Sequence, residues 1–197
     1  GLGERAGGVW KSTDGGAVWT KLESLPGNGG VYGLAADPQN AGILYASNGS
    51  GLFKSTDRGT NWVNVYRTGR ALRLTMDPKS PNTLYIVLNG TFAGELPGVY
   101  KTTDGGKSWN PVNSGLPISL LDYIDTLVMD PQRTGTLYAA VRGKGVYRTT
   151  DGGANWSVVN FGLGTLDVYT LAIDPQDTST LYAGTSSGVF SITFAAQ

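Results

Sequence analysis

The segment STDGGAVW, residues 12–19, decides the fold of this chain, because close copies of it return three times. The copies are STDRGTNW at 55–62, TTDGGKSW at 102–109 and TTDGGANW at 149–156, so successive copies start 43, 47 and 47 residues apart. Each copy has a hydroxyl residue, an Asp two positions later, a Gly two after that and a Trp three further on. Repeats of this length predict stacked supersecondary units, of which propeller blades are the leading all-β option.

Short segments rich in β-branched and aromatic residues surround each copy and predict β-strands. In the first complete unit these segments are VYGLAAD (31–37), ILYAS (43–47), LFKS (52–55) and WVNVY (62–66). The next two units repeat that order, whereas the chain opens on strands three and four and closes on strands one to three. No segment shows a helical periodicity of useful length.

We therefore predict an all-β fold, a β-propeller with four-stranded antiparallel blades and about four blades in this chain. Residues 1–197 are expected to form a single domain. Its units fall at about 1–29 (partial), 30–69, 70–121, 122–166 and 167–197 (partial). Because both end units are partial, we expect them to share one blade and close a small ring. The alternatives are a part of a larger propeller and a propeller that several copies close together.

The connections between the predicted strands are of two kinds. The step from the Asp of each Asp-Pro pair to the Leu of the next Leu-Tyr pair is always seven residues, and the repeated turn never changes length. The strand two to strand three connection varies from 8 to 15 residues between its aromatic markers, and the strand four to strand one connection varies from 15 to 21. Alternate connections of an up-and-down sheet lie at the same edge, so variable loops should gather on one face. Repeat proteins usually bind ligands on the face that tolerates insertions.

The repeated turn is predicted to be structural. Its Asp can accept hydrogen bonds from backbone N–H groups of its own turn, its Gly supplies a positive φ, and its Trp brings a large apolar area that seals the blade edge. One carboxylate per turn is a poor calcium site, so no metal is expected there. The residues assigned this role are Asp14, Trp19, Asp57, Trp62, Asp104, Trp109, Asp151 and Trp156.

Composition removes several classes of function. Fifteen basic and fifteen acidic residues give a formal net charge of zero, which argues against nucleic acid as a partner. No apolar run approaches the ~18 residues that a membrane span needs, so no membrane insertion is expected. The chain has no Cys and no His. This excludes disulfides, a Cys nucleophile and a Ser-His-Asp triad, and it argues against catalytic zinc, so no cofactor is expected.

The pattern S/T-x-D-x-G-x-x-W, together with the Asp-Pro and Leu-Tyr signatures, resembles the Asp-box or BNR repeat of β-propellers. That group includes sialidases, xyloglucan-degrading glycoside hydrolases, sortilin-type receptors, photosystem II assembly factors and secreted bacterial proteins. The resemblance implies the fold and a secreted or cell-surface bacterial protein, but the box is structural in all these families. The Arg-Ile-Pro signature of sialidases is missing here. The xyloglucan hydrolases join two propellers with an acid on each, and this chain has room for one.

The variable face carries the candidate functional residues. The resemblance and the mixture of aromatic and polar side chains favour a non-catalytic propeller that binds carbohydrate or protein there. The alternative is a glycoside hydrolase, or a fragment of one, that uses carboxylates at the propeller mouth. Self-association through open blade edges is also expected. The ligand-binding candidates are Arg70, Arg73, Tyr123, Tyr169, Phe92, Arg142 and Lys144. The weaker catalytic candidates are Asp122, Asp125, Asp167 and Glu95.

Overall fold

The structure is a computed structural model that describes residues 8–22, 25–27, 30–67, 71–90, 96–120 and 122–194, with only the backbone of 71 and 72. Within these residues the chain is all-β and contains no helix, as predicted. The strands of the first part are β1 (Val9–Lys11), β2 (Thr20–Leu22), β3 (Gly33–Ala36), β4 (Leu44–Asn48), β5 (Gly51–Ser55) and β6 (Val63–Tyr66). The middle strands are β7 (Ala71–Met76), β8 (Leu84–Leu88), β9 (Gly98–Thr102) and β10 (Asn110–Pro111). The last strands are β11 (Ile124–Met129), β12 (Leu137–Val141), β13 (Gly145–Thr149), β14 (Ser157–Val158), β15 (Val168–Ile173), β16 (Thr180–Thr185) and β17 (Gly188–Thr193).

The strands form propeller blades in the predicted order. Strands β3 to β6, β7 to β10 and β11 to β14 each make a four-stranded antiparallel sheet whose strands are hydrogen-bonded in chain order. A two-stranded sheet, β1-β2, comes before them and a three-stranded sheet, β15-β16-β17, follows. The second strands β8 and β12, LYIVL and LYAAV, are continuously apolar, because neighbouring blades cover both faces of each strand.

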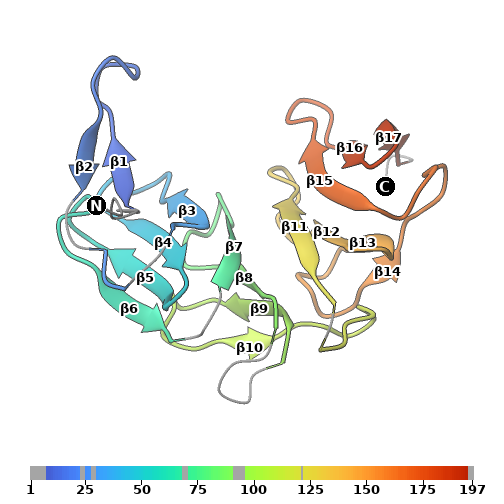
Figure 1. Cartoon of the computed structure of the whole chain (residues 1–197), viewed down its shortest axis with the longest axis horizontal. Helices are drawn as coiled ribbons and strands as arrows, with labels where there is room; N and C mark the ends of the chain where they lie inside the picture. The colour runs from blue at the N-terminus through green and yellow to red at the C-terminus, as the bar shows by residue number, and fades with distance from the viewer. Residues whose placement is uncertain are drawn as a thin grey trace, which may run out of the picture.

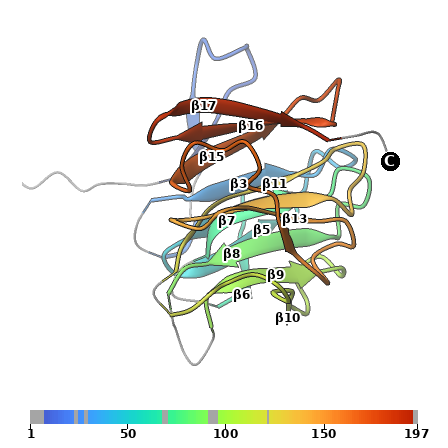
Figure 2. The same ribbon diagram turned by 90° about the vertical axis from the view of Figure 1, so that its right-hand side faces the viewer.

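The blades stand around an arc, with their first strands on the inside (Figure 1). The first strands β3, β7, β11 and β15 contact one another in turn along this inner edge. Viewed from the side, the antiparallel strands of all blades lie roughly along one common axis (Figure 2). Their connections therefore gather at two opposite ends of the molecule. We call the end with the Asp-Pro turns and the repeated turns the fixed-turn face, and the opposite end the variable-loop face.

The two ends of the chain do not share a blade. Strands β1-β2 and β15-β16-β17 belong to separate sheets, and the open side of the arc lies between them in Figure 1. The expectation that the ends close a small ring is therefore not met in the described residues. The physical reason is local: β17 pairs with β16 and occupies the place of a third strand, so β1, which is the third strand of its own unit, cannot pair with β16.

The hydrophobic core is divided into clusters that lie between successive blades. One cluster joins Tyr85 and Val87 of β8 to Leu127 of β11 and to Trp156. Another joins Tyr138 of β12 to residues of β15 and β16. Burying apolar area is the main favourable term in folding, so each blade is stabilised chiefly by its neighbours.

Hydrogen bonds of the repeated turns fix the loop between strands three and four. The Oδ1 atom of Asp151 accepts from the Thr149 hydroxyl at 2.7 Å and from the backbone N–H of Asn155 at 2.9 Å. The Thr149 hydroxyl in turn accepts from the N–H of Gly153 at 3.1 Å. Hydrogen bonds from Thr149 and then Asn155 lower the pKa of Asp151 to about 2. The carboxylate is thus fully engaged within its own turn.

The four Trp residues of the repeated turns do not share one environment. Trp62 and Trp156 are buried and Trp109 is partly buried, but the side chain of Trp19 is 58% exposed. The expectation that Trp19 seals a blade edge is therefore wrong in this structure. Each buried Trp packs toward the preceding blade, as Trp62 does with Val9. The described residues contain no blade before β1-β2, so Trp19 has nothing to pack against.

The Gly153→Ala variant is expected to lose about 2 kcal/mol of unfolding free energy. Gly153 has φ 94°, and a Cβ atom there would lie 2.9 Å from Cγ2 of Val112 in the preceding blade. Gly143→Ala is the matched control, since Gly143 has φ 68° but no atom within 4 Å of the added Cβ. The control should lose only the backbone strain, about 1 kcal/mol. Urea denaturation measures both, and equal losses would contradict the packing role of Gly153.

Candidate functional site

The first strands of three blades carry a β-bulge at the variable-loop face. The register shifts lie between Ala71 and Arg73, between Ile124 and Thr126, and between Val168 and Thr170. The extra residues in the last two are Asp125 and Tyr169. A bulge twists the strand and re-aims the side chain of its extra residue, often beside a functional site. The bulges therefore present Asp125 and Tyr169 at the inner rim of the arc.

A bidentate ion pair lies at the centre of this rim. Arg142 donates from Nη2 to Oδ1 of Asp125 at 2.5 Å and from Nε to Oδ2 at 2.9 Å. Arg73 comes from the neighbouring blade and donates from Nε to the carbonyl oxygen of Asp125 at 2.7 Å. The hydrogen bonds to Asp125 raise the pKa of Arg142. Two basic side chains from adjacent blades thus converge on one bulged residue.

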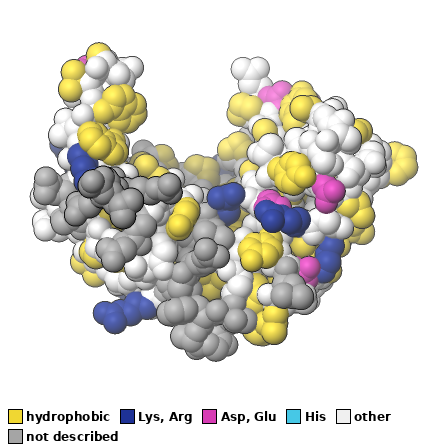
Figure 3. Space-filling model, viewed as in Figure 1, with side chains coloured by type: hydrophobic (Ala, Val, Ile, Leu, Met, Phe, Trp, Pro, Cys, Tyr) yellow, Lys and Arg dark blue, Asp and Glu magenta, His cyan; other side chains and the backbone are white. Residues whose placement is uncertain are grey.

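Aromatic side chains surround the ion pair. The guanidinium carbon of Arg142 lies 5.2 Å from the ring centroid of Tyr123, within cation–π distance. Tyr169 is near enough for its electrostatic interaction to add to the raised pKa of Arg142, and both Tyr rings are exposed. We call Arg73, Tyr123, Asp125, Arg142 and Tyr169 the rim cluster. Seen as in Figure 1, basic, acidic and apolar side chains are interspersed over the arm that holds β11 to β15 (Figure 3).

A second ion pair supports the loop beside the rim cluster. Lys144 donates from Nζ to Oδ2 of Asp122 at 2.7 Å and to the carbonyl oxygen of Pro117 at 2.7 Å. The same carboxylate oxygen accepts from the N–H of Ser119 at 2.6 Å. The hydrogen bond from Lys144, followed by that from Ser119, lowers the pKa of Asp122. A general acid of a glycosidase needs a raised pKa, whereas the pKa of Asp122 is lowered. Asp122 is therefore suited to holding its loop in place and not to donating a proton.

The remaining candidates are placed as follows. Asp167 is exposed in the loop before β15, and its backbone carbonyl accepts from the N–H of Ser186 at 3.1 Å. Three candidates, Arg70, Phe92 and Glu95, lie outside the described residues. The structure therefore brings five of the predicted residues together in the rim cluster and two, Asp122 and Lys144, in the second ion pair.

Sequence reasoning missed the exposed Tyr32 and the pairing of Arg142 with Asp125. A signal for Tyr32 was present, because Tyr32, Asp125 and Tyr169 each stand five residues before the Asp of an Asp-Pro pair. The pairing had no such signal, because Arg142 belongs to a hairpin of variable length. In the described residues, no group of three or more His, Cys, Asp or Glu is placed to hold a metal ion. The same residues contain no helix long and apolar enough to cross a membrane.

Comparison with known proteins identifies similar sequences among xyloglucanases. No protein-family model matches the chain. A xyloglucanase of Hypocrea jecorina (strain QM6a) is 30% identical over 147 residues, which cover 70% of this chain and 17% of the relative. A xyloglucanase of Paenibacillus sp is 33% identical over 92 residues, 42% of this chain and 9% of the relative. The chain thus spans less than a fifth of the length of these curated relatives.

Solved structures show the same fold. The GH74 enzyme of Niastella koreensis matches with a TM-score of 0.64 and 27% identity, over 84% of this chain and 29% of that one. An extracellular domain of a hybrid two-component system from B. thetaiotaomicron matches with a TM-score of 0.71 and 12% identity, over 97% of this chain and 25% of that one. The chain is a β-propeller protein. The comparisons favour the glycoside hydrolase alternative over the non-catalytic binder.

Proposed function

We propose that this chain is a xyloglucanase-like glycoside hydrolase, or a fragment of one, and that it binds a xyloglucan-type polysaccharide on its variable-loop face. The observation that carries the proposal is the similarity to a xyloglucanase over 70% of the chain. The second support is the rim cluster, in which the guanidinium group of Arg142 lies over the exposed ring of Tyr123 and the exposed Tyr169 belongs to the same rim. Flat aromatic faces pack against sugar rings while Arg donates hydrogen bonds to hydroxyl groups, and such a mixture is typical of ligand sites.

Each member of the rim cluster has a distinct part in this proposal. Tyr123 and Tyr169 provide apolar platforms, and Arg142 provides hydrogen-bond donors beside Tyr123. Asp125 orients Arg142 through the bidentate pair, which fixes the guanidinium plane. Arg73 holds the bulge backbone through its hydrogen bond to Asp125. The cluster therefore offers a rigid surface, and rigidity lowers the entropy cost of binding.

The two carboxylates at the rim are assigned to positioning and not to hydrolysis. Asp125 and Asp122 are each held in an ion pair with a basic residue. A glycosidase needs one carboxyl group that stays protonated to donate to the leaving oxygen. The hydrogen bonds from Lys144 and Ser119 lower the pKa of Asp122 and so favour its ionised form, and both carboxylate oxygens of Asp125 are occupied by Arg142. We propose that the described residues contribute substrate binding to the hydrolase function.

Three further assignments accompany the proposal. The hydrogen bonds of the repeated turns support membership of the Asp-box propellers. Residues 1–197 are proposed to be one domain, since core clusters connect each blade to the next. The extracellular domain among the similar structures supports a secreted or cell-surface location.

Calorimetric titration with xyloglucan oligosaccharides tests the binding proposal. The Tyr169→Ala variant is expected to bind about tenfold more weakly, which corresponds to the loss of about 1.4 kcal/mol of stacking. Trp19→Ala is the matched control, because it also removes an exposed aromatic ring, but from the fixed-turn face. Its affinity should equal that of the unsubstituted chain. An equal loss in both variants, or no binding by the unsubstituted chain at millimolar oligosaccharide, would refute the proposal.

A further inference from the structure

The β-bulge at the start of β11 is held by a side chain of the preceding blade. Both backbone polar groups of Ile124, a residue that is 1% exposed, bond to Asn89. The N–H of Ile124 donates to Oδ1 of Asn89 at 2.9 Å, and Nδ2 of Asn89 donates to the carbonyl of Ile124 at 3.1 Å. Asn89 directly follows β8. One amide group of one blade therefore pairs with the backbone of the next as a neighbouring strand would.

The backbone on either side of this contact belongs to the rim cluster and is held as well. The carbonyl of Tyr123 accepts from the backbone N–H of Arg142 at 2.9 Å. The carbonyl of Asp125 accepts from Nε of Arg73 at 2.7 Å. Arg73 on β7 and Asn89 after β8 belong to the same blade, which precedes that of β11. The preceding blade thus holds the bulge at two consecutive residues.

The equivalent N–H in β15 has a local partner instead. Val168 stands six residues before the Asp of its Asp-Pro pair, as Ile124 does. Its N–H donates to the carbonyl of Leu166, two residues earlier, at 3.1 Å. The residue after β12, in the place that Asn89 takes after β8, is Arg142, and its side chain bonds within its own blade. The N–H at the β11 bulge thus depends on another blade, whereas that at the β15 bulge does not.

An amide side chain suits this contact for a chemical reason. Asn carries an acceptor and two donors on a short side chain, so it can satisfy the N–H and the C=O of one residue together. Asn89 is 7% exposed, and Ile124 lies in the core cluster between the two blades. Water is therefore largely kept from the contact, and the loss of the amide would leave two buried backbone groups unpaired.

We infer that Asn89 is a positioning residue of the rim cluster. It fixes the bulge of β11, and the bulge aims the carboxylate of Asp125. That carboxylate in turn orients the guanidinium group of Arg142 through the bidentate pair. When the backbone groups of a bulge are free, its extra residue can shift along the strand and change the face to which its side chain points. The aim of Arg142 therefore depends on a contact between two blades.

Solvent exchange of the Nε–H of Arg142 tests this inference without any ligand. This hydrogen is donated to Oδ2 of Asp125 at 2.9 Å, so its exchange rate, measured by nuclear magnetic resonance, reports whether the pair persists. The Asn89→Ala variant should exchange this hydrogen about tenfold faster, because the carboxylate loses its aim. The backbone N–H of Ile124 should also exchange faster, since its acceptor is gone.

Asn48→Ala is the matched control, because Asn48 is a buried Asn at the end of β4 that also holds two backbone groups. Its Nδ2 donates to the carbonyl of Pro26 at 2.9 Å, and its Oδ1 accepts from the N–H of Ser50 at 2.8 Å. These partners lie outside the rim cluster. Asn48→Ala and Asn89→Ala should each lower the melting temperature by about 5 °C. Only Asn89→Ala should change the exchange at Arg142.

Affinity for xyloglucan oligosaccharides is the second measurement, and this part of the test rests on the proposed function. Asn89→Ala should bind about tenfold more weakly than the unsubstituted chain, whereas Asn48→Ala should bind equally well. If the unsubstituted chain does not bind, the proposed function fails, and the exchange at Arg142 still decides the role of Asn89.

Three results would overturn the inference. The first is an unchanged exchange rate at Arg142 in Asn89→Ala. The second is an equal acceleration in Asn48→Ala, which would mean that any loss of stability loosens the pair. The third is faster exchange with undiminished affinity in a chain that binds. Asn89→Ser keeps one hydrogen-bonding group for the bulge and replaces Asn89→Ala if that variant does not fold. An exchange rate in Asn89→Ser equal to that of the unsubstituted protein would likewise overturn the inference.

Discussion

Replacing Trp156 with alanine is expected to lower the free energy of unfolding by about 3–5 kcal/mol. The side chain is 5% exposed and packs with Tyr85, Val87 and Leu127 in the cluster between two blades. Its Nε1 donates to the carbonyl of Val112 in the preceding blade at 2.8 Å. The substitution therefore leaves a cavity and an unpaired, partly buried carbonyl at the same time, and both effects destabilise the interface.

Trp19→Ala is the matched control for this prediction. The residue occupies the same place in its repeated turn but is 58% exposed, so its loss should change the unfolding free energy by about 0.5 kcal/mol or less. Urea denaturation followed by tryptophan fluorescence and circular dichroism measures both variants. If the two substitutions cost the same, the stabilising role of Trp156 would have to come from the turn itself and not from contact with the preceding blade.

The blades could be predicted from the sequence because each is specified locally. The alternation of Leu-Tyr strands with turns of constant length determines where strands begin and end, and the Asp and Gly of each repeated turn define the reversal. The structure forms the complete blades in that order. Local signals sufficed here, because neighbouring strands of a blade are joined by short connections.

The ends of the arc and the candidate site were harder to predict, for a different reason. The environment of Trp19 depends on a neighbouring blade, and its own turn, STDGGAVW, follows the same pattern as TTDGGANW, whose Trp156 is buried. Likewise, Asp125 and Arg142 are 17 residues apart, and only the bulge in β11 turns the carboxylate toward the guanidinium group. Single-turn patterns carry no information on such contacts, which depend on how blades and hairpins meet.

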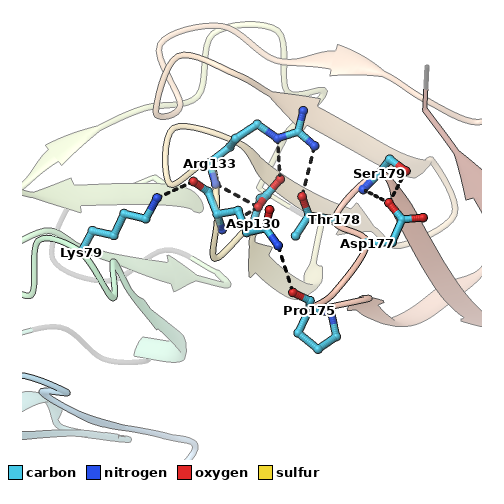
Figure 4. Close-up of polar contacts among 8 residues, drawn as sticks. Lys79, Asp130, Arg133, Pro175, Asp177, Thr178 and Ser179 are labelled. Atoms are coloured by element: carbon cyan, nitrogen blue, oxygen red, sulfur yellow. Dashed lines mark hydrogen bonds and ion pairs between the residues drawn. The ribbon is translucent and has the colours of Figure 1, made fainter. Parts of the chain in front are cut away.

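The Asp130→Ala variant is expected to lose about 3 kcal/mol of unfolding free energy. Oδ1 of Asp130 accepts from the backbone N–H groups of Gln132 at 2.8 Å and Arg133 at 2.9 Å. Oδ2 accepts from Nε of Arg133 at 3.1 Å, and Nη2 of that residue donates to the hydroxyl of Thr178 in the next blade at 3.1 Å (Figure 4). The carboxylate thus organises both its own turn and a link between two blades.

The expected loss lies at the low end of the range for breaking a buried ion pair. The side chain of Asp130 is 1% exposed, whereas that of Arg133 is 44% exposed. Water can therefore solvate the guanidinium group of Arg133 once its partner is gone, which lowers the cost of breaking the pair. Asp37→Ala is the matched control, because Asp37 accepts from the backbone N–H groups of Gln39 and Asn40 in the same way but has no described ion pair. That variant should lose about 1 kcal/mol, the value of the turn hydrogen bonds alone.

A double-mutant cycle with Arg133→Ala separates the two contributions of Asp130. If the ion pair and the link to Thr178 add to the turn, Asp130→Ala in the Arg133→Ala background should lose about 2 kcal/mol less than in the unsubstituted protein. Losses that are identical in the two backgrounds would assign the whole effect to the turn. The blade contact through Arg133 would then orient the turn without stabilising it, and Asp130 would be equivalent to Asp37 in spite of its deeper burial.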